Sequence, residues 1–375
     1  MKLLILLLGA LILGCLAAEK HSAVRHRRAL RHVIHVNGTR GKSGVARLIA
    51  AGLAGAGFKT FCKTTGTLPM TIDTSGNEHE LRRRGPSNIR EQLKILRMAH
   101  EDGAEILVAE CMALDPELQA VSQHEMLRAD VTVITNCRID HVAEMGATVE
   151  EVCDALCATV PKNGVVFTAD SACYPQISAA AARLGSRAEL VSAPPEGFPG
   201  LEEPFPENIA LALAVCRSLG ADEASALEGM RHVKKDPYTA SLHRLPGGAL
   251  FLNGMSANDP LSTELLPGRF PEIARETCRT VYLLNTRGDR GYRTDLMLKL
   301  LRTQSPEEVW LLGDGSAAAR RRLRGVSAVH ICRSVSRLPL DEFPAGTLVY
   351  AIGNIAGPGM ELMERIGKEG TPLVR

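Results

Sequence analysis

The stretch VNGTRGKSG, residues 36–44, lies between a short apolar run and the helix-like segment VARLIAAGLAGAG, residues 45–57. The common phosphate-binding loop reads GxxxxGK[ST], and Val36 stands where its first glycine is expected. What remains is Gly38-Thr39-Arg40-Gly41-Lys42-Ser43. Backbone N–H groups and the helix dipole at such a strand-to-helix turn favour a bound phosphate. The stretch therefore predicts a shortened phosphate loop, with a plain surface turn as the alternative.

Within the loop, Lys42 is expected to hold ATP phosphates and Ser43 to bind Mg²⁺. Three further segments place polar residues after apolar runs. Glu110 ends the run AEILVAE, where open α/β sheets bind ligands, although it would also suit the cap of the next helix. His141 follows the run TVIT and fits a metal ligand or a neighbour of one, although a lone histidine is more often structural. The turn KTTGT, residues 63–67, adds a lysine near the same edge or is a solvated turn.

Short β-rich runs alternate with helical segments from residue 32 onward. Apolar strands separated by helices indicate an α/β fold with parallel sheets covered on both faces. A Pro/Gly-rich stretch, residues 192–209, and a helical pair interrupt this series, and a second one starts near residue 249. We expect four segments: a membrane anchor at 1–19, a basic juxtamembrane linker at 20–31, an ATP-binding domain at 32–240, and a smaller Rossmann-like domain at 241–375.

The first eighteen residues are apolar except for Lys2, and basic residues follow them directly. Such basic residues hold their side of a span in the cytoplasm, which predicts a single-pass protein of the cell membrane with cytoplasmic catalytic domains. A cleaved signal peptide, or a lipoprotein site at Cys15, is the alternative. A net charge of +2 and 4% aromatic residues give no sign of a nucleic-acid partner. The ten cysteines contain no CxxC pair, and Cys153 and Cys157 are expected to be buried thiols of a reduced protein.

These motifs together resemble the Mur ligase superfamily, and most closely the ligase subunit of poly-γ-glutamate synthase. The matching stretches run in order along the chain: NGTRGKS, KTTGT, GPSNIREQ, ECMALDP, DHVAEMGAT, ENIALAL, NGMSANDPLST, NTRGDR and GNIAGPG. The resemblance implies a Mur-ligase-like P-loop domain followed by a smaller α/β domain, behind an N-terminal transmembrane helix.

The resemblance also implies roles for single residues. Lys42, Glu110, His141 and Arg287 would be catalytic, and Ser43, Glu110 and His141 would hold Mg²⁺ or Mn²⁺. The nucleotide would be bound by Gly38, Thr39, Arg40, Gly41, Lys42, Ser43, Asn208, Asp259 and Arg290. Two departures stand out. The helix after the DH motif has no lysine, which argues against a carbamate, and the roughly thirty residues before the loop leave no room for a UDP-sugar domain.

The expected function is ATP-dependent ligation of glutamate into poly-γ-glutamate through an acyl-phosphate. Glutamate, a growing polyglutamate chain and small membrane-embedded synthase or export subunits are the implied partners, and a homo-oligomer is left open. A folylpolyglutamate-synthase-like ligase acting on a small molecule is the first alternative. A P-loop phosphotransferase or NTPase without ligase activity is the second, and a membrane-tethered nucleotide-binding scaffold without enzymatic activity is the third.

Overall fold

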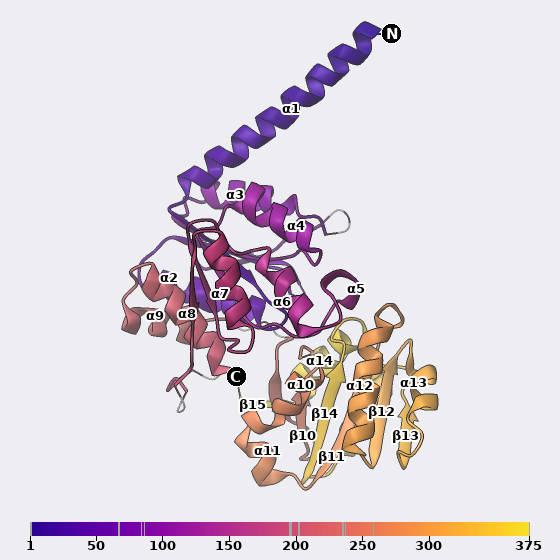
Figure 1. Ribbon diagram of the computed structural model, residues 1–375. Helices are drawn as coiled ribbons and strands as arrows, with labels where there is room; N and C mark the ends of the chain where they lie inside the picture. Colours follow the sequence, from indigo (N-terminus) through magenta and orange to yellow (C-terminus); the bar gives the residue numbers. More distant parts are fainter. Residues whose placement is uncertain are drawn as a thin grey trace. The chain divides into compact units, whose positions relative to one another are not determined.

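The computed structural model describes residues 2–66, 68–83, 85, 87–194, 197–201, 203–234, 236, 238–257 and 259–374. The chain forms two compact units (Figure 1). Unit 1 comprises Met1–Leu201 and Pro206–Lys234, and unit 2 comprises Glu202–Phe205 and Lys235–Arg375. Each unit contains a mainly parallel sheet with helices, so the α/β class is confirmed. The assignment of functional domains to 32–240 and 241–375 stays a prediction.

The sheet of unit 1 has the strand order β4-β3-β2-β5-β1-β6-β7-β8. Strands β2, β5, β1, β6, β7 and β8 run parallel, and β3 and β4 are antiparallel additions. In the register, Val36 of β1 pairs with Glu110 of β5. The strands are β1 (His32–Asn37), β2 (Thr60–Thr64), β3 (Met70–Ile72), β4 (Glu78–Glu80), β5 (Ile106–Glu110), β6 (Val131–Ile134), β7 (Val165–Thr168) and β8 (Arg187–Leu190).

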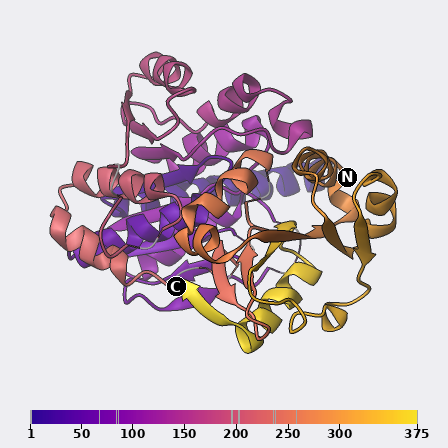
Figure 2. The ribbon, with the colours of Figure 1, turned by 90° about the horizontal axis from the view of Figure 1, so that it is seen from below.

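Helices cover both faces of this sheet (Figure 2). Ile34 and Val36 pack into a core with α2, α8 and α9, whereas Val33 packs with α3 on the other face. Burial on both faces explains why the strands read as continuous apolar runs. The helices are α2 (Lys42–Gly55), α3 (Glu91–Glu101), α4 (Pro116–Val121), the π-helix η1 (Ser122–Leu127), α5 (Val142–Met145), α6 (Val149–Cys157), α7 (Tyr174–Arg183), α8 (Pro206–Ser218) and α9 (Glu223–Arg231).

The sheet of unit 2 has the order β13-β12-β11-β14-β10-β9-β15, parallel from β13 to β10. Its strands are β9 (Ser241–Arg244), β10 (Leu250–Asn253), β11 (Arg279–Thr286), β12 (Glu308–Gly313), β13 (Ala328–Ile331), β14 (Thr347–Gly353) and β15 (Thr371–Val374). Its helices are α10 (Pro260–Leu265), α11 (Pro271–Glu276), α12 (Gly291–Gln304), α13 (Ser316–Arg322) and α14 (Pro358–Glu369), with 3₁₀ turns η2 (Pro267–Arg269), η3 (Gly288–Arg290) and η4 (Val335–Arg337).

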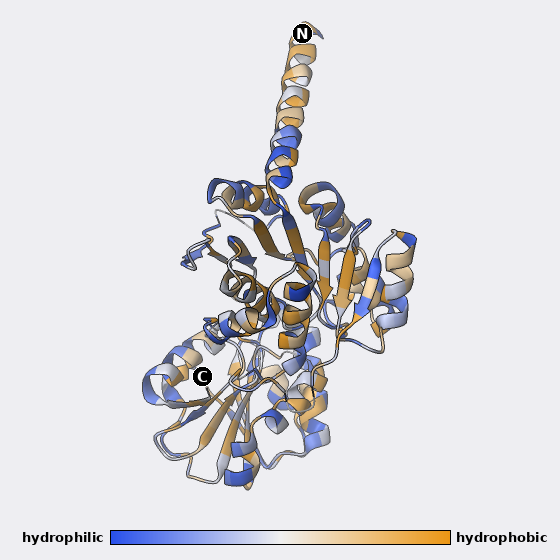
Figure 3. Cartoon of the chain, turned by 90° about the vertical axis from the view of Figure 1, so that its left-hand side faces the viewer, coloured by the Kyte–Doolittle hydropathy of each residue, from blue (hydrophilic) through white to orange (hydrophobic). Residues whose placement is uncertain are grey.

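The N-terminal helix α1 (Lys2–Ala29) runs through both the predicted anchor and the predicted basic linker. Residues 20–29 contain no glycine or proline and continue the helix, and their role as a linker stays a prediction. Arg27 fixes its end to unit 1, because its Nη2 lies 2.7 Å from Asp130 Oδ2. The outer part of α1 is hydrophobic and the part nearest the sheet is hydrophilic (Figure 3). Across the described chain, α1 alone is long and apolar enough to cross a membrane.

Candidate active site

The predicted phosphate loop joins β1 to α2 and depends on two glycines in unusual conformations. Gly38 has φ 125°, and a Cβ there would lie 2.0 Å from Thr135 Oγ1. Gly41 has φ 79° and is the N-cap of α2, with no side-chain cap in the described structure. The first N–H groups of a helix have no intrahelical partner, and they carry the positive end of the dipole. The start of α2 is therefore open to an anion.

The loop that follows β6 holds the phosphate loop in place. Thr39 N donates to Asn136 O at 3.0 Å, and Arg40 N donates to Asn136 Oδ1 at 3.1 Å. Thr135 Oγ1 donates to Arg40 O at 2.6 Å, and Arg138 N donates to Thr39 Oγ1 at 2.8 Å. These contacts use the N–H groups of Thr39 and Arg40, the carbonyl of Arg40 and the hydroxyl of Thr39. They fix its shape while leaving the start of α2 uncovered.

Ser43 and Glu110 meet at this loop. Ser43 Oγ donates to Glu110 Oε2 at 2.8 Å, and Thr65 N of the KTTGT turn donates to the same oxygen at 2.6 Å. Glu110 is only 3% exposed. The structure thus brings together the first helix turn, the end of β5 and the turn after β2. Thr67 of that turn lies outside the described residues.

Lys42 lies folded over the loop, with its Nζ donating to Gly38 O at 2.7 Å. Burial lowers the pKa of its ammonium group, and the nearby Glu110 carboxylate offsets part of this effect. A lysine in this position has its charge beside the open end of α2. Both features fit a group that exchanges a backbone carbonyl for a phosphate oxygen when a nucleotide binds.

Lys63 takes part in a buried ion pair that the sequence did not predict. Its side chain is fully buried, and Nζ lies 3.2 Å from Glu91 Oε1 of α3. Glu91 also accepts hydrogen bonds from Arg83 Nε at 2.7 Å and Nη2 at 3.0 Å. Burial lowers the pKa of Lys63, and Glu91 counteracts this. The turn KTTGT pointed to Lys63, but no sequence spacing pointed to its two partners.

His141 lies in the loop between β6 and α5. It has φ 49° and its Nε2 lies 3.6 Å from Asp140 Oδ2. Asp140 also pairs with Arg40, whose Nη1 is 2.7 Å from Asp140 Oδ2. Asn208 of α8 lies against the loop, because a Cβ on Gly41 would be 3.0 Å from Asn208 Oδ1. The placement of these residues around the loop leaves their nucleotide and metal roles as predictions.

Three predicted site residues belong to unit 2. Asp259 is 4% exposed and caps α10, accepting from Ser262 N at 2.9 Å and from Ser262 Oγ at 2.5 Å. Arg287 pairs with Asp289, with Nη2 2.6 Å from Oδ2. Arg290 lies in η3, and its side chain is outside the described part of the structure. Roles for these residues at the nucleotide stay predictions.

Asn37 is a site residue that the sequence reading missed. Its Oδ1 accepts from Gly38 N at 2.9 Å, and its Nδ2 donates to Gln119 Oε1 at 2.7 Å. Both side chains are buried, so this pair sets how the chain leaves β1. Asn37 could have been found from the sequence, because it directly precedes Gly38 of the loop. Nothing in the sequence singled out Gln119 as its partner.

An open helix start whose serine contacts a strand-end carboxylate is typical of enzymes that use ATP phosphates. Residues 36–195 match the family model of the Mur ligase middle domain. A bifunctional folylpolyglutamate synthase/dihydrofolate synthase of Yersinia pestis, solved with AMPPNP and manganese, has a similar fold, with a TM-score of 0.69 and 15% sequence identity. The match covers 93% of this chain and 92% of that chain. FolC of E. coli in complex with ADP gives a TM-score of 0.66 at 15% identity, covering 93% of each chain. The chain is therefore an ATP-dependent amide ligase with a Mur-ligase-like fold.

Two findings show the family to which the chain belongs: a family model that matches its second unit, and relatives that match nearly its whole length. Residues 243–369 match the poly-gamma-glutamate synthase CapB C-terminal domain. The PGA synthase CapB of Bacillus subtilis (strain 168) is 32% identical over 379 residues, covering 95% of this chain and 95% of that protein. The capsule biosynthesis protein CapB of Bacillus anthracis is 32% identical over 371 residues, covering 92% of this chain and 79% of that protein. The chain belongs to the poly-γ-glutamate synthase CapB family.

Proposed function

We propose that this protein polymerises glutamate into poly-γ-glutamate, using ATP and an acyl-phosphate intermediate. The observation that carries the proposal is the contact of Ser43 with Glu110 beside the open start of α2. Membership of the CapB family supports glutamate as the substrate.

The donor set fits a small divalent cation. A serine hydroxyl and a carboxylate are hard oxygen ligands, which suit Mg²⁺ and also Mn²⁺. We assign Ser43 and Glu110 to this ion, with His141 as a further ligand. The ion supplies charge neutralisation of the phosphates when bound. Lys42 would leave Gly38 O for the β- and γ-phosphates, and the N–H groups at the start of α2 would bind the remaining phosphate oxygens.

The proposed reaction has two steps. A carboxylate oxygen of the glutamate chain attacks the γ-phosphorus, the bond to the β-phosphate bridging oxygen breaks, and ADP leaves. The amine of the next glutamate then attacks the acyl carbon, loses a proton and expels phosphate. Asn208 is assigned to the adenine, and Asp259, Arg287 and Arg290 are assigned to closure over the reacting groups, where exclusion of water protects the acyl-phosphate.

The proposal includes a membrane location. The outer part of α1 is exposed and apolar, and its inner part carries Arg25, Arg27 and Arg28. Basic residues on that side favour a cytoplasmic position for both units. A polyanion made there needs a route outward, so small membrane-embedded subunits are the expected partners. Their identity, and a homo-oligomeric state, belong to the same proposal.

Membranes containing the full-length protein and its partner subunits should be incubated with ATP, Mg²⁺ and labelled glutamate. The proposal predicts ADP release that depends on glutamate, together with a non-dialysable labelled polymer. Lys42→Ala should abolish both, whereas Lys59→Ala, an exposed lysine next to β2, should not. ATP hydrolysis indifferent to amino acids would support the NTPase alternative. Incorporation that requires an added folate would support the folylpolyglutamate-type alternative.

A further inference from the structure

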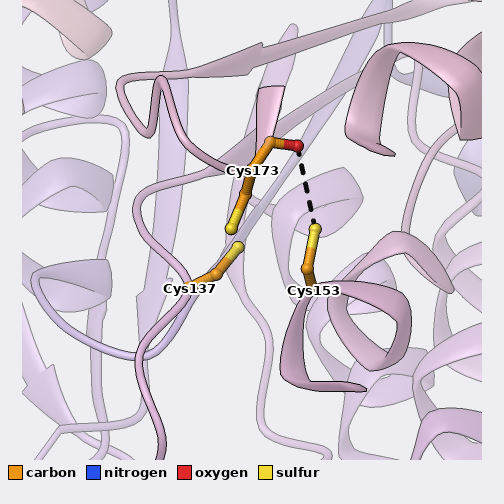
Figure 4. A group of neighbouring side chains, drawn as sticks. All are labelled: Cys137, Cys153 and Cys173. Atoms are coloured by element: carbon orange, nitrogen blue, oxygen red, sulfur yellow. Dashed lines mark hydrogen bonds between the residues drawn. The ribbon is translucent and has the colours of Figure 1, made fainter. Parts of the chain in front are cut away.

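Three cysteines far apart in the sequence converge at one point in unit 1 (Figure 4). Cys137 lies in the loop after β6, Cys153 lies on α6, and Cys173 is the N-cap residue of α7. Their sulfur atoms all lie within 4.8 Å of one another. Their exposed fractions are 4%, 0% and 4%. No part of the proposed ligase reaction uses these thiols.

The backbone around the three thiols is fixed by hydrogen bonds. Asp170 Oδ2 accepts from Cys137 N at 2.9 Å, and Asp170 Oδ1 accepts from Cys173 N at 3.1 Å. Cys153 Sγ donates to Cys173 O at 3.9 Å. One carboxylate therefore sets two of the three cysteine positions. Backbone hydrogen bonds therefore hold the three cysteines close together, and the cluster does not depend on flexible side chains alone.

The spacing suits a metal ion bound through sulfur. Sulfur ligands lie about 2.3 Å from Zn²⁺, so two of them in a tetrahedral site are about 3.8 Å apart. The three sulfurs lie within 4.8 Å of one another, so a change of about 1 Å or less in each separation would bring them to that distance. Thiolates select soft cations such as Cu⁺ and Zn²⁺ over Mg²⁺. Cys157 lies one turn after Cys153 on α6 and is half-buried, but it is not one of the three cysteines whose sulfurs lie within 4.8 Å of one another.

We propose that Cys137, Cys153 and Cys173 form a binding site for a thiophilic cation of the Zn²⁺ or Cu⁺ type. The competing explanation is that they are small apolar side chains filling the core, which contains Ile134, Val152 and Ile177 nearby. Simple core filling does not require three thiols from three separate elements to share one point. The site is separate from Ser43 and Glu110, whose oxygen ligands suit a hard ion instead.

The location gives the site a consequence for the phosphate loop. Cys137 stands between Asn136 and Arg138, and both of these residues contact Thr39 of the loop. An ion on Cys137 would restrict the loop that follows β6, and through these contacts it would preorganise the phosphate loop. This step rests on the proposed nucleotide site. The binding of the cation itself does not.

The test uses the full-length protein, reduced and freed of metal, titrated separately with Co²⁺, Cd²⁺ and Cu⁺. We expect sulfur-to-metal charge-transfer absorption that saturates at one ion per chain for at least one of these cations. Cys137→Ser and Cys153→Ser should lose it, whereas Cys216→Ala should keep it, because Cys216 is equally buried but belongs to another core. Should Cys153→Ser fail to fold, Cys153→Ala replaces it, with circular dichroism as the check.

Two results would overturn the metal site: no saturable absorption with any cation, or absorption that survives both cluster substitutions. A disulfide among the three cysteines in protein purified without reductant would overturn it as well. The coupling is tested by the affinity for a fluorescent ATP analogue, which we expect to be several-fold tighter with the ion bound. If the affinity for the ATP analogue is the same with and without the bound cation, only the coupling is refuted, and the metal site stands. Loss of ATP binding in the loaded protein would instead contradict the proposed function.

Discussion

The two units contain the same strand–turn–helix arrangement but finish it differently. In unit 1, β1 leads through Gly41 into α2, and no side chain in the described structure caps that helix. In unit 2, β10 leads through Asp259 into α10, and the Asp259 carboxylate binds Ser262 N. The N–H groups at a helix start are satisfied by side chains of the protein, by water or by a ligand. Other helices, such as α13 and α14, also start without a side-chain cap, so the phosphate site is distinguished by the open start of α2 together with the Ser43–Glu110 contact beside it.

The polar groups buried in the two units also differ. Unit 1 buries charges near its phosphate loop, namely Glu110 and the Lys63–Glu91 pair. Unit 2 buries the Asp259 carboxylate, but its other buried polar groups among the described residues are amides and hydroxyls, and Asn285 Nδ2 there donates to Asn354 O at 2.5 Å. Buried charges are costly unless they are paired, whereas buried amides need only hydrogen bonds. Retention of charges in unit 1 is what a site for an anionic nucleotide requires.

The largest expected effect concerns the buried ion pair. Glu91→Gln should reduce the free energy of unfolding by about 3–5 kcal/mol, because it leaves the Lys63 ammonium buried without its counter-charge. Urea unfolding followed by circular dichroism measures this. Glu101→Gln, an exposed position on the same helix, is the control and should change stability little. A loss below about 1 kcal/mol for Glu91→Gln would contradict the contrast between charged and amide cores.

The same pair predicts a pH dependence. Burial works to raise the pKa of Glu91, but the hydrogen bond from Arg83 and the charge of Lys63 outweigh it, and the pKa is lowered from 4.5. A lowered folded pKa gives stability that is complete above the unfolded value and is lost as the pH falls through the folded value. Unfolding experiments below pH 4.5 should therefore show a steeper loss for the wild type than for Glu91→Gln.

The next effect concerns catalysis at the open helix. Lys42→Ala should reduce glutamate-dependent ADP release by about 10²–10³-fold, the usual loss when one group that stabilises developing charge is removed. Because the hydrogen bond that Lys42 Nζ donates in the structure goes to the Gly38 carbonyl of the same loop, we expect little change in stability. A coupled assay for ADP, with Lys59→Ala as control, measures it. An equal loss of activity in Lys42→Ala and Lys59→Ala would contradict a specific role for Lys42, because removal of any lysine charge would then have the same effect.

A smaller effect is expected when the Glu110 carboxylate is neutralised. Glu110→Gln keeps the size of the side chain and an acceptor for Ser43 and Thr65, but it removes the negative charge. The concentration of Mg²⁺ needed for half-maximal activity should rise about 10–100-fold. Glu105→Gln, one residue before β5, is exposed and should leave it unchanged. An unchanged Mg²⁺ requirement in Glu110→Gln would remove Glu110 from the metal site.

Much of this architecture was predictable from the sequence, because it rests on local patterns. Apolar runs gave the strands, and the carboxyl ends of parallel strands share an edge, which correctly brought Ser43 and Glu110 together. The partners of Lys63 and the cysteine cluster were not predictable. Cys137, Cys153 and Cys173 have no ligand spacing in sequence, and only the packing of α6 and α7 joins them. Long-range contacts of this kind depend on tertiary structure alone.

The end of the basic segment illustrates the same limit. The sequence predicted a linker at 20–31, because charges follow the apolar run. In the structure α1 continues to Ala29, and Arg27 pairs with Asp130, which lies just before β6. Arginine and alanine are good helix formers, and a salt bridge to a distant residue has no local signal. Composition alone therefore did not show that this segment is helical or that Arg27 pairs with Asp130.

The smallest effect concerns the capped helix, and it separates two roles for Asp259. As a cap, Asp259→Ala should cost about 1 kcal/mol of stability, whereas Asp259→Asn should cost little, because asparagine is an equally good N-cap. As a nucleotide-site residue, Asp259 would need its charge, and Asp259→Asn would then lose ligase activity at unchanged stability. Thermal unfolding and ADP release, measured on both variants, give the answer. Full activity in Asp259→Asn would make the carboxylate a cap only, and the contrast between the open start of α2 and the self-capped start of α10 would then stand.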